Sequence, residues 1–217
     1  MKTHPPSGLR AAMRAGLAAC ALLLAVGPAA AFDLPELMAL LAAQTHGEAR
    51  FTEQRFVQGL AAPQASSGTL SFRAPDRLAR RTLAPRVEAF AVEGNTLTMT
   101  RGGRSRNVAL DSAPELVAIV EALRGTLSGN AAVLQRHFRS ALAGGADGWT
   151  LDLMPIDAQL ATQVRGLRVA GSRGELRSVE MQFAGGDRSL MAIEPLRGDA
   201  TVPEPAPQRP SAPVRRP

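Results

Sequence analysis

The feature that most constrains the fold is a run of short alternating segments between Gly68 and Val108. Leu70 and Phe72 alternate with small polar residues, which is the period of a strand with one buried face. Glycine and proline turns separate this strand, 68–73, from four further candidates at 78–83, 87–92, 95–101 and 104–109. Connections this short cannot carry a crossover, so we expect consecutive strands to pair in an antiparallel meander.

Helical signals lie on both sides of this meander. Asp33 and Glu36 have the spacing of a capping box at the start of a helix, which is followed by a strand at 49–59. A second helix starts at Ser112, and its apolar stripe ends at Leu127. Asn130 starts a third, which is predicted to reach Arg139. Further strands are expected at 149–153, 165–170, 175–183 and 188–194, with a helical turn at 158–164.

The two ends of the chain have compositions that set them apart from the fold. Residues 1–31 combine a basic start, an apolar run from Ala15 to Val26 and small residues before Phe32, which predicts a cleaved signal peptide. A rival interpretation makes Cys20 the lipidated residue of a lipobox, but the apolar run Ala21–Val26 lies after it. We therefore expect a domain at 32–202 and a disordered Pro/Arg-rich tail at 203–217.

Neither charge nor residue spacing points to nucleic-acid binding or catalysis. The predicted signal holds three of the 25 basic residues and none of the 19 acidic ones, which leaves 22 minus 19, or +3. His46 and His137 have no metal-ligand spacing, and Asp147 and Asp152 flank Trp149 as expected of a loop and a strand edge. We predict a protein that is not an enzyme, uses no cofactor or metal, binds no nucleic acid and is a monomer.

A curled sheet must cover its concave face, and the two central helices are the available cover. If they cover it loosely, an apolar cavity results; if they pack tightly, they complete a dry core. Burying an acyl chain contributes roughly 0.8 kcal/mol per methylene group, so only a deep cavity could hold one. These residues alone leave both alternatives open.

Several short motifs resemble the LolA family of periplasmic outer-membrane lipoprotein carriers. They are Gly68–Phe72, Pro75, Leu78, Pro85 and Val92–Leu97, together with Phe51–Gln54 after the first helix. The resemblance covers about residues 33–195, including the order of the predicted elements. It implies an incomplete antiparallel β-barrel whose concave face is covered by helices. It also implies acyl chains as ligand, an inner-membrane exporter as donor and an outer-membrane acceptor.

The sequence departs from this family at two positions. Family members place an arginine before the proline that matches Pro75, where it fastens the helical cover; here that residue is Ala74. They also place a tryptophan inside the barrel at the position of Arg80. An arginine facing an acyl cavity is costly unless it is paired. Either this strand is rotated or the ligand carries a charged head group, which Arg73, Arg77 and Arg80 would contact. The alternative for these arginines is a solvated strand edge that discourages pairing with other strands.

The resulting interpretation is a periplasmic carrier that binds the acyl chains of lipoproteins or related envelope lipids and moves them toward the outer membrane. The alternative is an envelope binding or scaffold module of the same fold with a filled core. The residues predicted to line the cavity are Leu70, Phe72, Phe90, Leu97 and Met99 from the sheet, and Leu116, Ile119, Val120 and Leu123 from the central helix.

Overall fold

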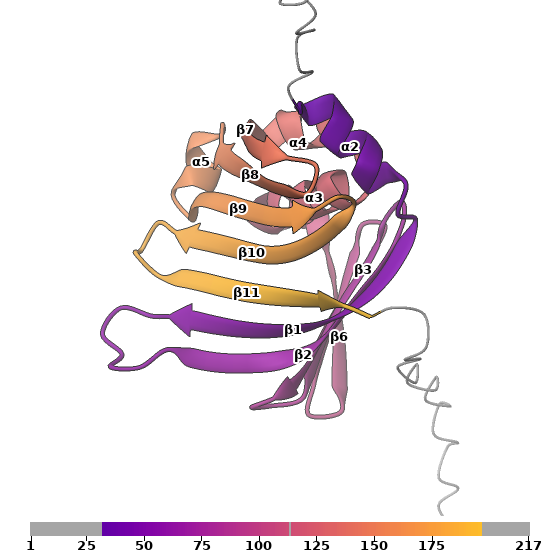
Figure 1. The fold of residues 1–217 in the computed structure, drawn as a ribbon. Helices are drawn as coiled ribbons and strands as arrows, with labels where there is room; N and C mark the ends of the chain where they lie inside the picture. The colour runs from indigo at the N-terminus through magenta and orange to yellow at the C-terminus, as the bar shows by residue number, and fades with distance from the viewer. Residues whose placement is uncertain (1–31, 113, 197–217) are drawn as a thin grey trace, which may run out of the picture. The chain divides into compact units, whose positions relative to one another are not determined.

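The computed structural model describes residues 32–112 and 114–196, which form an α+β fold (Figure 1). The predicted signal peptide 1–31, Cys20 and the tail 203–217 lie outside these residues. Within the described residues, each helix falls short of the length and apolar character that a membrane-spanning helix requires.

The described strands form one eleven-stranded antiparallel sheet in the order β6-β5-β4-β3-β2-β1-β11-β10-β9-β8-β7. Two local meanders, one of the first six strands and one of the last five, are joined by the pairing of β1 with β11. The bounds are β1 (His46–Phe56), β2 (Gln64–Arg73), β3 (Arg77–Ala84), β4 (Glu88–Glu93), β5 (Thr96–Arg101), β6 (Arg104–Ala109), β7 (Phe138–Gly145), β8 (Gly148–Pro155), β9 (Val164–Ser172), β10 (Glu175–Phe183) and β11 (Arg188–Pro195).

The sheet is curved and is not closed into a barrel. Strands β6 and β7 are its two edges, and the described strands include no pairing between them. The helical segments are α2 (Leu34–Ala42), the short 3₁₀ helix η2 (Leu110–Ser112), α3 (Pro114–Leu127), α4 (Ala131–His137) and α5 (Ala158–Ala161). The predicted α+β class and incomplete antiparallel barrel with covering helices are confirmed.

The main difference from the sequence prediction lies at the end of the third helix. Helix α4 stops at His137, and Phe138 begins strand β7, which pairs along its length with β8. The spacing of Leu134 and Phe138 fits a helical face, and both side chains are buried. Pairing with β8 supplies the backbone hydrogen bonds of β7, so tertiary structure overrides the local helical pattern.

Buried apolar side chains lie on both the helices and the sheet. They include Leu37 of α2, Leu134 of α4 and Trp149 of β8, whose indole donates a 2.9 Å hydrogen bond to the Arg173 carbonyl. Near α3, an apolar cluster is built on Val92, Leu97 and Leu110, with Leu78, Met99, Val117 and Val120 packed against it. The predicted capping box of α2 is present: the Asp33 carboxylate accepts from the Glu36 amide at 2.9 Å, and the Asp33 amide donates to the Glu36 carboxylate at 3.3 Å.

Gly129 connects the covering helices at a position where a side chain cannot be accommodated. It follows α3 with a φ of +65°, and a Cβ atom there would lie 2.1 Å from the Met38 carbonyl oxygen on α2. We expect Gly129→Ala to lower the free energy of unfolding by at least about 2 kcal/mol, since left-handed strain and a backbone clash add. Urea denaturation measures this change.

Gly59→Ala is the matched control for this prediction. Gly59 also has a positive φ, +83°, but a Cβ atom there would have nothing within 4 Å. Only the conformational strain then applies, and the expected loss is about 1 kcal/mol. Equal losses in the two variants would contradict the close approach of α2 to the end of α3.

Candidate functional site

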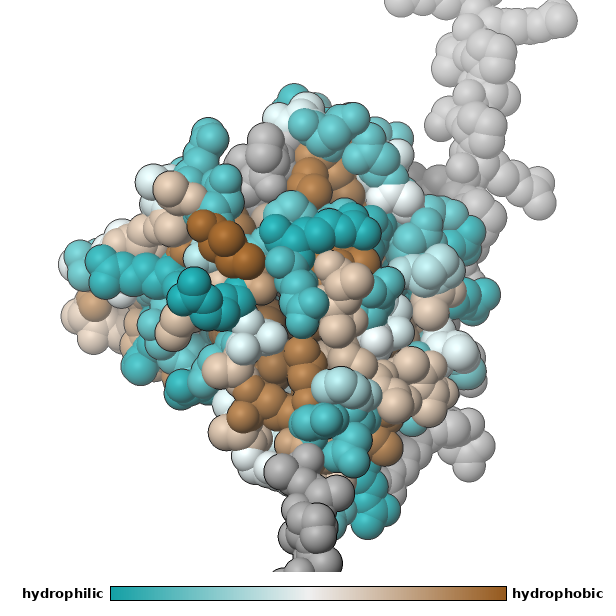
Figure 2. All heavy atoms as spheres, turned by 90° about the horizontal axis from the view of Figure 1, so that it is seen from above, coloured by the Kyte–Doolittle hydropathy of each residue, from teal (hydrophilic) through white to brown (hydrophobic). Residues whose placement is uncertain are grey.

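A cavity of about 860 Å³ lies between the concave face of the sheet and the helices α2 and α3. Strands β1 to β4 and β10 to β11 line the sheet side, while Leu41 of α2 and Val120, Leu123 and Leu127 of α3 line the helical side. Its volume is within the range of about 300–1,000 Å³ that small-molecule sites occupy. In Figure 2, apolar side chains gather in the middle of one face and hydrophilic ones surround them.

The structure brings five of the nine predicted cavity residues together around this space. Leu70 of β2, Phe72 of β2 and Phe90 of β4 line it from the sheet, and Val120 and Leu123 line it from α3. Strand alternation explains the sheet residues, because Leu70 is paired with Arg80 on β3 and Arg80 with Phe90 on β4. These side chains therefore form one row across three strands.

The other four predicted cavity residues lie elsewhere. Leu97 is buried in the apolar cluster with Val92, and Met99 packs against that cluster. Leu116 and Ile119 lie on α3 but do not border the cavity, and Leu116 is 37% exposed. The apolar stripe on α3 is wide enough to have two sides. One side contacts the cluster around Leu97, and the other side faces the cavity.

Of the three arginines predicted to contact a head group, only Arg80 borders the cavity. Arg73 is exposed at the end of β2. Arg77 forms an exposed ion pair with Glu93 of the neighbouring strand β4. Of these three arginines, Arg80 therefore has its guanidinium at the cavity, while those of Arg73 and Arg77 lie at the surface.

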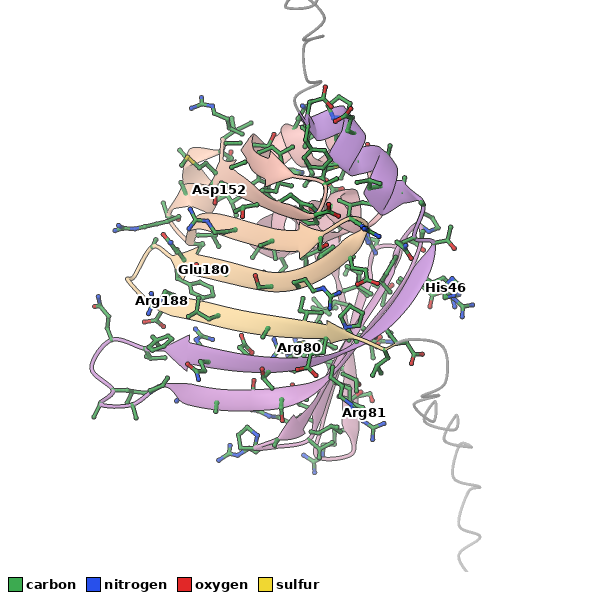
Figure 3. The ribbon with its side chains drawn as sticks, in the orientation of Figure 1. His46, Arg80, Arg81, Asp152, Glu180 and Arg188 are labelled. Carbon is green, nitrogen blue, oxygen red and sulfur yellow. The ribbon has the colours of Figure 1, made fainter. Side chains whose placement is uncertain are left out.

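Arg80, which Figure 3 labels, is held by a polar cluster that sequence reasoning missed. Its Nη2 donates to the Glu53 carboxylate of β1 at 2.5 Å, and the guanidinium lies 4.4 Å from the centre of the Phe51 ring. Glu53 also accepts hydrogen bonds from Ser66 of β2, at 3.1 Å, and from Ser189 of β11. We call Glu53, Arg80, Ser66 and Ser189 the cavity cluster; it joins four strands of the sheet.

The Glu53 carboxyl is ionised at neutral pH despite its location. Burial by itself raises the pKa of Glu53, but hydrogen bonds from Arg80 and Ser189, the positive charge of Arg80 and the bond from Ser66 outweigh it. The pKa therefore lies below the ordinary value of 4.5. Glu53 balances the charge of Arg80 inside the protein, so Arg80 faces the cavity without any rotation of β3 and with its charge already paired.

A second arginine connects the covering helix to the sheet. Arg124 of α3 donates through Nη2 to the carbonyl of Asp76, in the turn between β2 and β3, at 2.6 Å, and to that of Gly94, between β4 and β5, at 2.8 Å. The family resemblance assigns this fastening to the position of Ala74, where the chain has no charge. Here the arginine lies on the helix and its acceptors lie on the sheet.

Both histidines and both aspartates considered for catalysis have ordinary contacts. His137 lies 2.8 Å from Glu121 across the two helices, and His46 lies 3.3 Å from Thr45. Asp147 and Asp152 are paired with Arg173 and Arg168 at the surface. No cluster of three His, Cys, Asp or Glu side chains suited to a metal occurs among the described residues.

Comparisons with known proteins extend over most of the chain. The family model described as outer membrane lipoprotein carrier protein LolA-like matches residues 26–205. Similar crystal structures include the LolA superfamily protein NE2245 from Nitrosomonas europaea, with 11% identity, a TM-score of 0.42 and coverage of 76% of this chain and 92% of that one. A DUF1329 family protein from Desulfovibrio piger has 10% identity, a TM-score of 0.43 and coverage of 79% and 92%.

The lipoprotein LppX from Mycobacterium tuberculosis is similar at 11% identity and a TM-score of 0.37, over 74% of this chain and 94% of that one. A comparison with curated proteins finds no match.

Proposed function

Because the chain belongs to the LolA-like family of outer membrane lipoprotein carrier proteins, we propose that it binds acyl chains in the cavity under α2 and α3. The observation that carries the proposal is a cavity of about 860 Å³ whose lining is mainly apolar on both the sheet and the helical side. Each methylene group transferred from water into such a lining contributes roughly 0.8 kcal/mol. A space of this size supports ligand binding rather than the alternative of a scaffold module with a filled core.

The wider role we propose is that of a periplasmic carrier. The predicted signal peptide supports export, and the family description supports a lipoprotein or a related envelope lipid as cargo. In this proposal an inner-membrane exporter loads the protein and an outer-membrane acceptor unloads it, and the monomer acts without catalysis or a cofactor. The domain of residues 32–202 performs the binding, and the predicted tail 203–217 is outside it.

The test is a binding measurement with one change in the covering helix. Leu123 lines the cavity and is half-buried, so Leu123→Glu places a carboxylate in the acyl site. We expect binding of a fluorescent fatty acyl ester to fall at least about tenfold, which corresponds to 1.4 kcal/mol. Mass spectrometry of lipids extracted from protein purified without delipidation is expected to find acyl lipid on the unaltered protein and less on the variant.

Leu116→Glu is the matched control, because it makes the same change on the same helix. Leu116 is 37% exposed and does not border the cavity, so binding should be close to that of the unaltered protein. Circular dichroism establishes that both variants are folded. Lipid-free protein that also fails to bind the probe, or equal losses in the two variants, would refute acyl binding in this cavity.

A further inference from the structure

The cavity changes character along its length. The paired rows of β2 and β3 on the concave face run from Phe72 and Leu78, through Leu70 and Arg80, to Gly68 and Thr82. On the adjacent β1, the row continues past Phe51 to Glu53, which is paired with Ser66. Leu78 packs in the cluster near α3. The cavity is therefore apolar under α3 and polar at the cavity cluster, farther along the strands.

Glu53 and Arg80 are the least exposed charged residues in the lining. Their side chains are 14% and 29% exposed, whereas Arg55, which pairs with Asp187, is 48% exposed. His46 and Glu48 are exposed, and Glu175 is engaged with Arg177. A ligand that enters the cavity therefore meets a buried charge chiefly at the pair of Glu53 and Arg80.

Arg80 retains donor capacity toward a ligand. One nitrogen, Nη2, makes both of its hydrogen bonds, to Glu53 and, at 3.4 Å, to Ser66. Its Nε–H group is shielded from the cavity, but Nη1 makes no hydrogen bond within the described part of the chain and is not among the fully buried atoms. Nη1 can therefore donate to an acceptor atom on a ligand in the cavity.

The charge of the pair decides which acceptor suits it. Glu53 already neutralises Arg80, so a carboxylate or phosphate brought to the same place would lie beside the Glu53 carboxylate and be repelled. A neutral carbonyl oxygen accepts a hydrogen bond from Arg80 without that repulsion. Ester and amide carbonyls are the groups that join acyl chains to a lipid or protein carrier.

We infer that the cavity cluster makes this site selective for neutral acyl esters and amides over free fatty acids, with the linking carbonyl at Arg80 and the chain extending under α3. This inference rests on the proposed function and names its class of ligand. In this inference, Glu53 neutralises the positive charge of Arg80, so that the ligand contacts a neutral ion pair.

The experiment compares palmitic acid with methyl palmitate as competitors of a fluorescent acyl probe, at a mildly alkaline pH where the acid is ionised. The unaltered protein is expected to bind the ester more tightly. Glu53→Gln keeps the shape and an acceptor for Ser189 but frees the charge of Arg80, and the affinity ratio of acid to ester should rise about tenfold, the effect of one charge-assisted hydrogen bond. Adding Arg80→Gln to Glu53→Gln should abolish that rise.

Glu93→Gln is the matched control, since it removes a glutamate from an arginine pair outside the cavity and should leave the ratio unchanged. If the unaltered protein binds palmitic acid more tightly than methyl palmitate, the inference is overturned. This measurement does not depend on the folding of any variant. A ratio that Glu53→Gln leaves unchanged also overturns it, while the proposed acyl binding stands. If neither competitor binds the unaltered protein, the proposed function fails and the inference fails with it.

Discussion

Replacing Arg80 with methionine is expected to lower the free energy of unfolding by about 2–3 kcal/mol at neutral pH, at or below the lower end of the cost of breaking a fully buried ion pair on one side, because this pair is partly buried. The variant leaves the Glu53 carboxylate, 14% exposed, without its cation. Methionine retains an apolar stem that packs on Phe51, so the loss reports on the charge rather than on volume. Urea denaturation followed by circular dichroism measures it.

The dependence of this loss on pH identifies its cause. In the unaltered protein the pKa of Glu53 is lowered, so its stabilising contribution is present above the unfolded-state pKa and is lost as the pH falls through the folded-state pKa. Without Arg80, its hydrogen bond and its positive charge no longer lower the pKa of Glu53, so that pKa is higher than in the unaltered protein and acid relieves the buried charge sooner. The difference in stability between the two proteins should therefore be large at neutral pH and shrink as the pH falls from the folded-state pKa of Glu53 in the variant to the lower one in the unaltered protein.

Two further variants separate the ion pair from general effects of arginine removal. Arg168→Met breaks the exposed pair with Asp152, and it should leave the free energy of unfolding close to that of the unaltered protein. Adding Glu53→Gln to Arg80→Met removes the orphan charge and should recover most of the loss. A loss that is independent of pH, or one that Glu53→Gln fails to recover, would show that Arg80 acts through packing alone.

Arg124→Met is expected to destabilise the protein by about 2–3 kcal/mol and to loosen α3 selectively. The arginine donates charge-assisted hydrogen bonds to the carbonyls of Asp76 and Gly94, and such bonds contribute about 1.5–3 kcal/mol. Because both acceptors lie in turns of the sheet, their loss detaches the helix rather than unfolding the strands. Hydrogen exchange of the α3 amides should quicken more than that of β8 and β9.

The control for Arg124 is the same change on the neighbouring helix. Arg136 of α4 is 62% exposed and lies 3.9 Å from Glu121, so Arg136→Met should cost less than about 1 kcal/mol and leave α3 exchange unchanged. Uniform acceleration across the sheet and α3 in Arg124→Met would mean that the arginine stabilises the whole fold. In that case its bonds would not act as a specific fastening of the covering helix.

Most strands, turns and helix starts could be predicted, because each depends on residues that are close together in the sequence. Alternation around Leu70, the turns at Gly94 and Gly102, and the capping box at Asp33 each depend on residues within a few positions of one another. The structure bears these out as β2 to β6 and α2. Where a local pattern competed with a distant partner, as at Phe138, the sequence prediction was wrong, since β8 supplied hydrogen bonds that the helical pattern did not anticipate.

The candidate site was predictable only in part, for the same reason. Strand alternation and a helical stripe predict that Leu70, Phe72 and Val120 lie on apolar faces of their strand and helix. These patterns do not predict whether a face borders a cavity or a filled core. Glu53 could have been noticed, because it alternates with Phe51 on one face of the first strand. Its partners could not, since Arg80 lies two strands away and Ser189 is 136 residues farther along the chain.

Apart from β7, the sequence by itself determined the strands, their turns and the amphipathic helices, because the backbone conformation of each depends on near neighbours. The tertiary structure alone decided that β1 pairs with β11, which joins the two meanders. That pairing brings Ser189 to Glu53 and so settles how the charge of Arg80 is neutralised. A charge inside an apolar space is tolerated only when hydrogen bonds from several strands converge on it, and convergence of that kind exists only after the chain has folded.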